Sequence, residues 1–158
     1  MALTIRRANA SDAATLGSLG AALMRAHYAF DPQRFLAAGP HAETGYASFL
    51  GSQLDDDEAI VLVAEIDGRV VGYVFARLEP MSWKELRGPA GFIHDVLVDE
   101  AARNAGAGTA LVEAAIAWLR EQGAPRVVLG TAERNAAAQR LFERLGFRRT
   151  MIEMTREL

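Results

Sequence analysis

The sequence contains no cysteine. This absence excludes disulfides, thiolate metal sites and a cysteine nucleophile, so any group transfer must proceed without a thioester on the protein. The sequence also lacks a long apolar run: no stretch approaches the roughly 20 residues of a membrane span, and no apolar segment with a small-residue cleavage site opens the chain. We therefore expect a cytoplasmic protein that has no metal and no membrane partner.

The chain has little excess charge of either sign. Its 17 Lys and Arg residues and 20 Asp and Glu residues give a formal net charge of −3. This balance provides no basic field that would attract nucleic acid, so we expect no nucleic-acid partner. The chain has 158 residues, 51% of them hydrophobic, and shows no repeat, low-complexity linker or shift in composition. We expect one domain that spans residues 1–158.

Hydrophobic periodicity predicts ten helices and strands. In chain order they are a strand at 3–7, helices at 13–28 and 41–53, strands at 60–66, 70–78 and 91–98, a helix at 109–121, a strand at 126–131, a helix at 135–145 and a strand at 151–157. This order is typical of an α/β (α+β) fold in which about four helices flank a mixed sheet.

Local signals mark the ends of several of these elements. Ser11 stands at an N-cap position before the first helix, and the pair Asp67 and Gly68 is a hairpin signal between two strands. Asn135 is an N-cap candidate for the last helix, and Gly146 follows that helix at a C′ position.

A glycine-containing loop joins the strand at 91–98 to the next helix. A strand that runs through such a turn into a helix directs several backbone N–H groups and the positive end of the helix dipole at one point, which attracts an anion such as a pyrophosphate. Gly106 and Gly108 would let the backbone approach phosphate oxygens, and Arg103 would add a charge. Alone, this Gly-x-Gly pattern is equally typical of an ordinary tight connection.

Two better-known phosphate loops do not fit. A dinucleotide-binding fingerprint needs a third glycine where Leu111 stands, and a P-loop needs a Gly-Lys-Ser/Thr sequence that is absent. Both loops are therefore disfavoured, and the same two absences disfavour an unrelated nucleotide-binding α/β domain.

Two longer segments resemble the signatures of the GNAT superfamily of acyl-CoA-dependent N-acetyltransferases. Residues 93–108 read IHDVLVDEAARNAGAG and resemble the strand with its Arg/Gln-x-x-Gly-x-Gly/Ala loop. Residues 135–147 read NAAAQRLFERLGF and resemble the family's Asn-x-x-Ala-x-x-Leu-Tyr-x-x-x-Gly-Phe helix. The two signatures occur in the expected order, and the predicted strand order matches nearly the whole chain.

The resemblance implies a mostly antiparallel sheet with a V-shaped splay between its fourth and fifth strands, at 91–98 and 126–131. Acetyl-CoA would lie in this splay, and the backbone of the fourth strand would pair with the pantetheine amides. Asn135 would contact the cofactor, or cap its helix, or do both. The residues implied in cofactor binding are Val96, Leu97, Val98, Arg103, Asn104, Ala105, Gly106, Ala107, Gly108, Thr109, Asn135, Ala138 and Phe142.

The activity implied is direct transfer of an acetyl or other acyl group from acyl-CoA to a primary amine of a small molecule or a protein. The alternative is a non-catalytic module of the same fold that binds or senses acyl-CoA. Because dimers are common in this family, the resemblance also implies a possible homodimer.

The usual proton donor of the family is missing. Many members carry a Tyr where Phe142 stands, and a phenyl ring cannot donate a proton. A thiol with a pKa of about 8.5 still leaves as a thiolate, so water or a neighbouring hydroxyl would suffice. Tyr28, Tyr46 and Tyr73 are the available substitutes, and a packing role is favoured for each.

His94 is the first candidate for the general base, because an imidazole titrates near neutral pH. Asp95 follows it and is the second candidate catalytic residue, on the opposite face of the strand unless a bulge re-aims one of them. Glu133 is a further candidate base, although a solvated loop carboxylate is the favoured interpretation.

For the acceptor, the resemblance points to the N-terminal helices and the loop at 79–89. Tyr28, Phe30 and Trp83 are the candidate acceptor residues, and Asp31, Glu79 or Glu85 would hold a cationic amine. Packing explains most of the aromatics on the helices. Trp83 is the strongest candidate, because it is a large aromatic in a polar, proline-flanked loop.

Overall fold

The computed structural model describes residues 2–158, so Met1 of the expected domain lies outside the described residues. The elements are β1 (Leu3–Arg7), α1 (Ala13–Phe30), α2 (Ala42–Gln53), β2 (Ala59–Ile66), β3 (Arg69–Glu79), β4 (Ala90–Val98), α3 (Ala107–Glu121), β5 (Val127–Leu129) and α4 (Ala136–Arg144). Two short 3-10 turns, Ala10–Asp12 and Glu100–Ala102, complete them. The four predicted helices and the first five strands are confirmed, with small shifts in their bounds.

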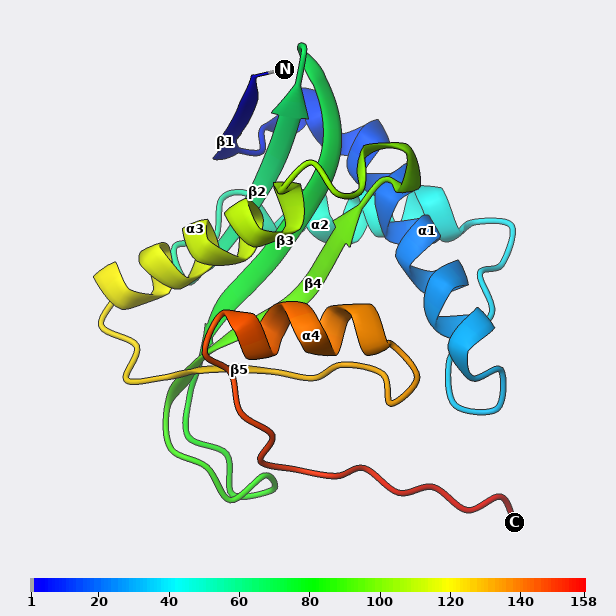
Figure 1. Cartoon of the computed structure of the whole chain (residues 1–158), viewed down its shortest axis with the longest axis vertical. Helices are drawn as coiled ribbons and strands as arrows, with labels where there is room; N and C mark the ends of the chain where they lie inside the picture. Colours follow the sequence, from blue (N-terminus) through cyan, green and yellow to red (C-terminus); the bar gives the residue numbers. More distant parts are fainter. Residues whose placement is uncertain (1) are drawn as a thin grey trace.

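The strands form a mixed, mostly antiparallel sheet in the order β1-β2-β3-β4-β5 (Figure 1). Only β4 and β5 pair in parallel. A tight turn joins β2 to β3, with left-handed φ values of 52° at Asp67 and 76° at Gly68, as a type I′ hairpin requires. The predicted fold class and the hairpin are therefore confirmed.

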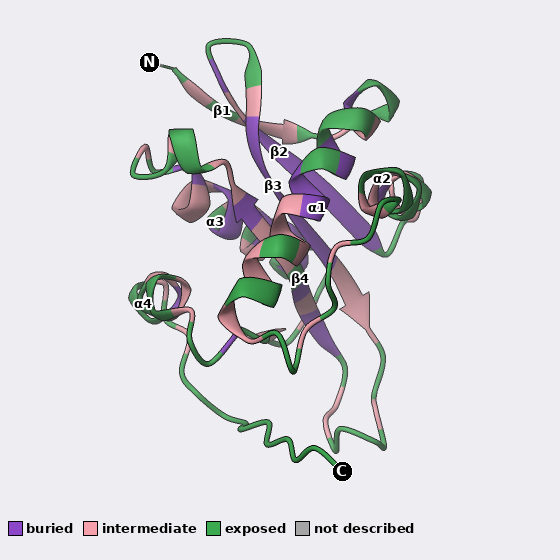
Figure 2. Cartoon of the chain, turned by 90° about the vertical axis from the view of Figure 1, so that its right-hand side faces the viewer, coloured by how far each residue is buried: buried purple, intermediate pink, exposed green. Residues whose placement is uncertain are grey.

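Helices cover both faces of the sheet, with α3 on one side and α2 on the other (Figure 2). β2 shows the consequence, because its alternate residues enter two different cores. Ile60 and Leu62 pack with Leu111 and Leu119 of α3, whereas Val61, Val63 and their neighbours pack with Leu16 and Leu50 of α1 and α2. A strand covered on both faces reads as a continuous apolar run, which is how this strand reads in the sequence.

The fourth and fifth strands separate after a short pairing. β4 pairs with β5 only from Gly91 to Ile93, opposite Val127 to Leu129. β4 then continues to Val98, while the chain after β5 runs towards α4 (Figure 1). The predicted strand at 126–131 is thus shorter than expected, and within residues 2–158 no strand lies beside the backbone of β4 beyond Ile93 on the β5 side.

Two expectations from the sequence are wrong. Asn9, not Ser11, is the cap at the start of the first helical segment: its side chain accepts a hydrogen bond from the Ser11 N–H, and Asp12 accepts one from the Asn9 N–H. The predicted strand at 151–157 is not formed either. That segment is exposed (Figure 2) and pairs with no strand of the described sheet, because alternation alone does not bring a segment to a neighbouring strand.

Among residues 2–158, none of the helices combines the length and the apolar character needed to cross a bilayer.

Candidate functional site

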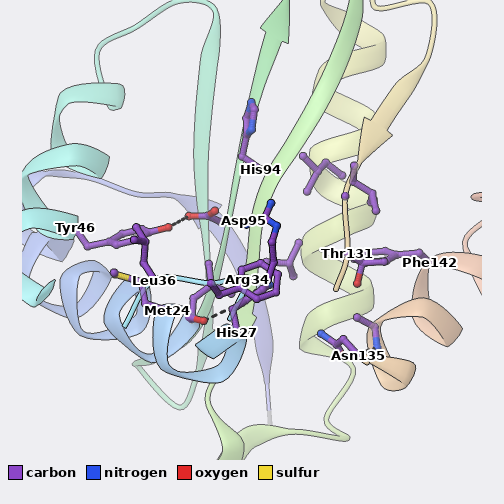
Figure 3. A pocket seen from close by; sticks show the side chains of 17 residues that line it. Met24, His27, Arg34, Leu36, Tyr46, His94, Asp95, Thr131, Asn135 and Phe142 are labelled. Carbon is purple, nitrogen blue, oxygen red and sulfur yellow. Dashed lines mark hydrogen bonds between the residues drawn. The ribbon is translucent and has the colours of Figure 1, made fainter. Parts of the chain in front are cut away.

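A cavity of about 420 Å³ lies between the N-terminal helices and the splayed end of the sheet (Figure 3). We call one side the N-terminal wall; it consists of Leu23, Met24, His27, Arg34, Phe35, Leu36 and Tyr46. We call the other side the C-terminal wall; it consists of Leu129, Gly130, Thr131, Asn135, Ala138 and Phe142. Residues Ile93 to Val96 of β4 form the floor between them.

A β-bulge shapes the floor. In the pairing of β3 with β4, Phe75 lies opposite Asp95 and Ala76 lies opposite Ile93, so His94 has no partner. The extra residue directs His94 and Asp95 to the same face, because His94 stacks on Phe75 and Asp95 contacts Tyr73, and both of these belong to the core beneath α1 and α2. Both predicted catalytic side chains therefore face the side of the N-terminal helices.

The His94 ring is held on two sides and by one carboxylate. It stacks between Phe75 and Phe92, with ring centroids 5.4 and 5.1 Å away. Its Nε2 lies 2.9 Å from Oε1 of Glu79. Nδ1 makes no hydrogen bond within the described part of the chain, and His94 lines the cavity. In the tautomer in which Nε2 donates to Glu79, Nδ1 is a free proton acceptor.

Asp95 accepts hydrogen bonds from two phenols. The hydroxyls of Tyr46 and Tyr73 lie 2.7 and 2.8 Å from Oδ2. Figure 3 shows the bond from Tyr46. Burial raises the pKa of both phenols well above the usual value, and the Asp95 charge raises each further. Both hydroxyls therefore stay protonated and hold the carboxylate in place at neutral pH.

Tyr46 reaches Asp95 because α1 and α2 approach each other closely. A Cβ added at Gly20 of α1 would stand 2.0 Å from Cδ1 of the Tyr46 ring. Only glycine leaves room for the ring there. Tyr46 thus packs, as the sequence favours, and also brings a polar group to the cavity.

On the C-terminal wall, Asn135 caps α4: its Oδ1 accepts a hydrogen bond from the N–H of Ala138 at 3.1 Å. The predicted capping role is confirmed, and Asn135 lines the cavity as well. Phe142 is 8% exposed and packs edge-on against Phe147. It gives the wall an apolar surface and no proton donor.

The glycine loop lies beside the cavity rather than in its lining. Ala110 donates the first helical hydrogen bond of α3, to the carbonyl of Gly106, so the N–H groups of residues 107–109 precede the helical ladder. Gly106 has a φ of 83°, and Asn104 has a φ of 70°. A Cβ at Gly108 would meet Leu141 and Val98 only at ordinary contact distances of 3.5 and 3.8 Å.

The remaining predicted residues lie elsewhere. The side chain of Leu97 is buried in the core beneath α1 and α2. Tyr28, Phe30 and Trp83 are not among the lining residues, and Trp83 is 81% exposed in the loop before β4. Glu133 is exposed and also lies outside the lining. The structure therefore does not bring the predicted acceptor residues together.

Several lining residues carry little signal in the sequence. Met24 and His27 lie close together on one face of α1, which helical spacing alone could have suggested. Arg34 lies in the irregular segment after α1, where no pattern marks it. Its guanidinium donates to the carboxylate of Glu153, with Nη2 lying 2.9 Å from Oε1.

Comparison with known families decides the relationship of the chain. The model of the Acetyltransferase (GNAT) family matches residues 21–147. The chain belongs to this family of acyltransferase enzymes. The resemblance seen in the two signatures is thereby confirmed.

Individual relatives fall into two kinds. The chain is 28% identical to the uncharacterized N-acetyltransferase YhfO of Bacillus subtilis (strain 168), over 92% of this chain and 89% of that protein. It is 35% identical over 98 residues to a mycothiol acetyltransferase of Thermomonospora curvata, which covers 62% of this chain and 31% of that protein. The chain thus spans about a third of the length of the mycothiol acetyltransferases that it matches.

Solved structures show the same fold. A tetramutant of the BH1408 protein from Bacillus halodurans superposes with a TM-score of 0.83 at 24% identity, over 98% of this chain and 99% of that chain. The aminoglycoside N-acetyltransferase AAC(6′)-Iy, solved in complex with CoA, superposes with a TM-score of 0.76 at 18% identity, over 99% of this chain and 95% of that chain.

Proposed function

We propose that this chain is a single-domain N-acetyltransferase that transfers an acetyl group from acetyl-CoA directly to a primary amine. The observation that carries the proposal is that one cavity is lined on one side by Asn135 and Phe142, which belong to the second family signature, and on its floor by the candidate catalytic residues His94 and Asp95. The acyl donor bound on the C-terminal wall and the amine acceptor bound on the N-terminal wall would meet over β4. The family match supports the same chemistry.

The splay of the sheet offers the place for acetyl-CoA. Beyond Ile93 the backbone of β4 has no strand beside it on the β5 side, so the pantetheine amides would pair with Val96 and Val98 as a neighbouring strand does. The pyrophosphate would lie at the N–H groups of residues 104–109, where Arg103 is exposed beside them. The packing around Gly108 leaves room for a Cβ, so packing alone does not explain the glycine. A close approach of the pyrophosphate to the backbone would explain it.

In the proposed reaction His94 accepts the proton of the amine. The amine nitrogen forms a bond to the thioester carbon, the C–S bond breaks, and the proton passes to Nδ1 of His94 while Glu79 holds Nε2. CoA leaves as a thiolate, which needs no donor in place of Phe142. Asp95 orients the amine, since its carboxylate is fixed by two phenols and lines the cavity.

The test is a panel of primary amines with acetyl-CoA, followed by the release of free thiol. The protein contributes no background because it contains no cysteine. Thiol release above solvent hydrolysis with any amine supports the proposal. Binding of acetyl-CoA without release for any amine or peptide would instead establish the sensing module, which the loss of a hydroxyl at Phe142 favours. The absence of acetyl-CoA binding would overturn both.

A further inference from the structure

The cavity contains a cation that already binds a carboxylate. Arg34 on the N-terminal wall donates from Nη2 to Oε1 of Glu153 at 2.9 Å, and from Nε to Oε2 of the same carboxylate. Two parallel bonds of this kind are the characteristic match between a guanidinium and a carboxylate. The two residues are 119 positions apart in the chain, so the fold and not their proximity in the sequence brings them together.

This contact is easily displaced. The side chains of Arg34 and Glu153 are 41% and 63% exposed, and an exposed ion pair contributes little to stability. Glu153 belongs to the exposed segment 148–158, which contains neither helix nor strand. Glu153 thus binds the Arg34 guanidinium, but no helix or strand holds Glu153 in that position. A ligand with its own carboxylate can therefore replace it.

An anionic group lies in the same cavity. Asp95 is on the floor, and no ion pair within residues 2–158 joins it to Arg34. Apolar side chains of the N-terminal wall, Leu23, Met24 and Leu36, line the cavity as well. A cation and an anion in one partly apolar cavity are complementary to a molecule that carries an amine and a carboxylate on a small apolar body.

The available space limits the size of that molecule. The cavity measures about 420 Å³, and Val96, Asn135, Ala138 and Phe142 of its lining belong to the side proposed for acetyl-CoA. The acyl end of the donor therefore takes part of this volume. The remainder suits an acceptor of the size of a single amino acid.

We propose that the acceptor is a single free amino acid whose carboxylate replaces Glu153 on Arg34 while its amine lies at Asp95. This inference rests on the proposed function and names the substrate class of the same site. Arg34 determines specificity and takes no part in proton transfer. The C-terminal segment competes with the acceptor through Glu153.

The first experiment compares amino acids with their amides. Leucine, methionine, phenylalanine and glutamate are each assayed beside the corresponding amide, with acetyl-CoA at saturation. The ratio of kcat/KM for acid over amide is then compared between the wild type and Arg34→Gln, so that the basicity of each amine cancels. We expect the ratio to fall about threefold to fivefold in Arg34→Gln for at least one pair, as for loss of a partly exposed ion pair.

Three further variants sharpen the test. Arg34→Lys keeps the positive charge but not the two parallel donors of the guanidinium, so its acid-to-amide ratio should lie between those of Arg34→Gln and the wild type. Glu153→Gln removes the competitor, so the KM for the amino acid falls by about twofold to fivefold. Arg148→Gln is the matched control: this arginine is exposed and outside the lining, and its loss leaves the ratio unchanged.

A binding measurement keeps this inference separate from the proposed function. The same amino acids and amides are titrated calorimetrically into the protein saturated with CoA, which needs no turnover. Binding of an amino acid that disappears in Arg34→Gln supports the inference even if no acetylation is seen, which would sink the proposed function alone. If no pair shows dependence on Arg34 in either measurement, or if amides and simple amines are preferred, the inference is overturned.

Discussion

The C-terminal wall of the cavity and the glycine loop come from one continuous stretch of chain, β4 to α4, whereas the N-terminal wall combines α1, the segment after it and α2. The first side offers mainly backbone groups and helix ends, such as the start of α3 and the cap at Asn135. The second offers side chains, Arg34 and Tyr46 among them. A ligand held by backbone leaves a local pattern in the sequence, while one held by dispersed side chains leaves almost none.

This contrast predicts that changes on each side affect different ligands. The largest effect should come from the floor. His94→Gln removes the proposed proton acceptor, so kcat should fall about 10²–10⁴-fold, as for loss of a general base. The limb of the pH–rate profile that reports the general base should disappear, and the Kd of acetyl-CoA should not change.

Steady-state kinetics from pH 5 to 9 check this, with His41→Gln as the control, because His41 is exposed and lies outside the cavity lining. An unchanged pH profile in His94→Gln would assign the base elsewhere, with Asp95 as the next candidate.

A smaller effect is expected on the N-terminal wall. Tyr46→Phe removes one of the two hydroxyls that hold Asp95 and leaves the ring that packs on Gly20. The KM for the amine should rise about tenfold, in line with a hydrogen bond to a charged group. The Kd of acetyl-CoA should stay as in the wild type. Tyr28→Phe serves as the control, since Tyr28 is 40% exposed and outside the lining. Equal losses for amine and acetyl-CoA would break the division between the walls.

The smallest effect on activity, with its main effect on stability, is expected at the ion pair that holds the start of α1. Arg6 of β1 donates to Asp12, just before α1, and to Glu65 of β2. The hydrogen bonds from Arg6 hold the pKa of Asp12 below its usual value. Asp12→Asn should lower the free energy of unfolding by about 2 kcal/mol, because Asp12 is buried and its partner stays charged.

The pH dependence of this ion pair follows from the lowered pKa. The stabilisation is complete above the usual carboxyl pKa of about 4 and is lost as the pH falls through the lower folded-state pKa. Urea unfolding between pH 7 and pH 2.5 should therefore show a steeper loss for the wild type than for Asp12→Asn. Asp57→Asn, at an exposed carboxylate, should follow the wild type. If Asp12→Asn and the wild type lose stability in parallel, the ion pair does not carry this stabilisation.

Much of the fold could be predicted because its signals are local. The hairpin at Asp67 and Gly68 and the end of α4 at Gly146 depend on a few adjacent residues with left-handed φ. The segment at 151–157 shows the limit of such reasoning. Its alternation is that of a strand, yet a strand needs a partner edge, and the pattern of one segment contains no information about that partner.

The site divides in the same way. The cap at Asn135 and the turn at Gly106 were predicted from neighbours in the sequence. Tyr46 and Tyr73 meet at Asp95 across separations of 49 and 22 residues, which only the fold reveals. The bulge leaves His94 unpaired and so brings His94 and Asp95 to the same face of the sheet. No sequence pattern marks the position of this bulge. Trp83 was singled out for its loop, and the structure leaves that loop away from the cavity lining.

The most direct test of acetyl-CoA binding at the glycine loop is a calorimetric titration of acetyl-CoA into the wild type, Gly106→Ala and Gly123→Ala. Both glycines have nearly the same left-handed φ, 83° and 84°, and open space around a Cβ, so both variants carry the same backbone strain. Only Gly106 lies in the proposed pyrophosphate loop. We predict a Kd at least about tenfold higher for Gly106→Ala and unchanged for Gly123→Ala. No binding by the wild type, or equal binding by all three proteins, would contradict it.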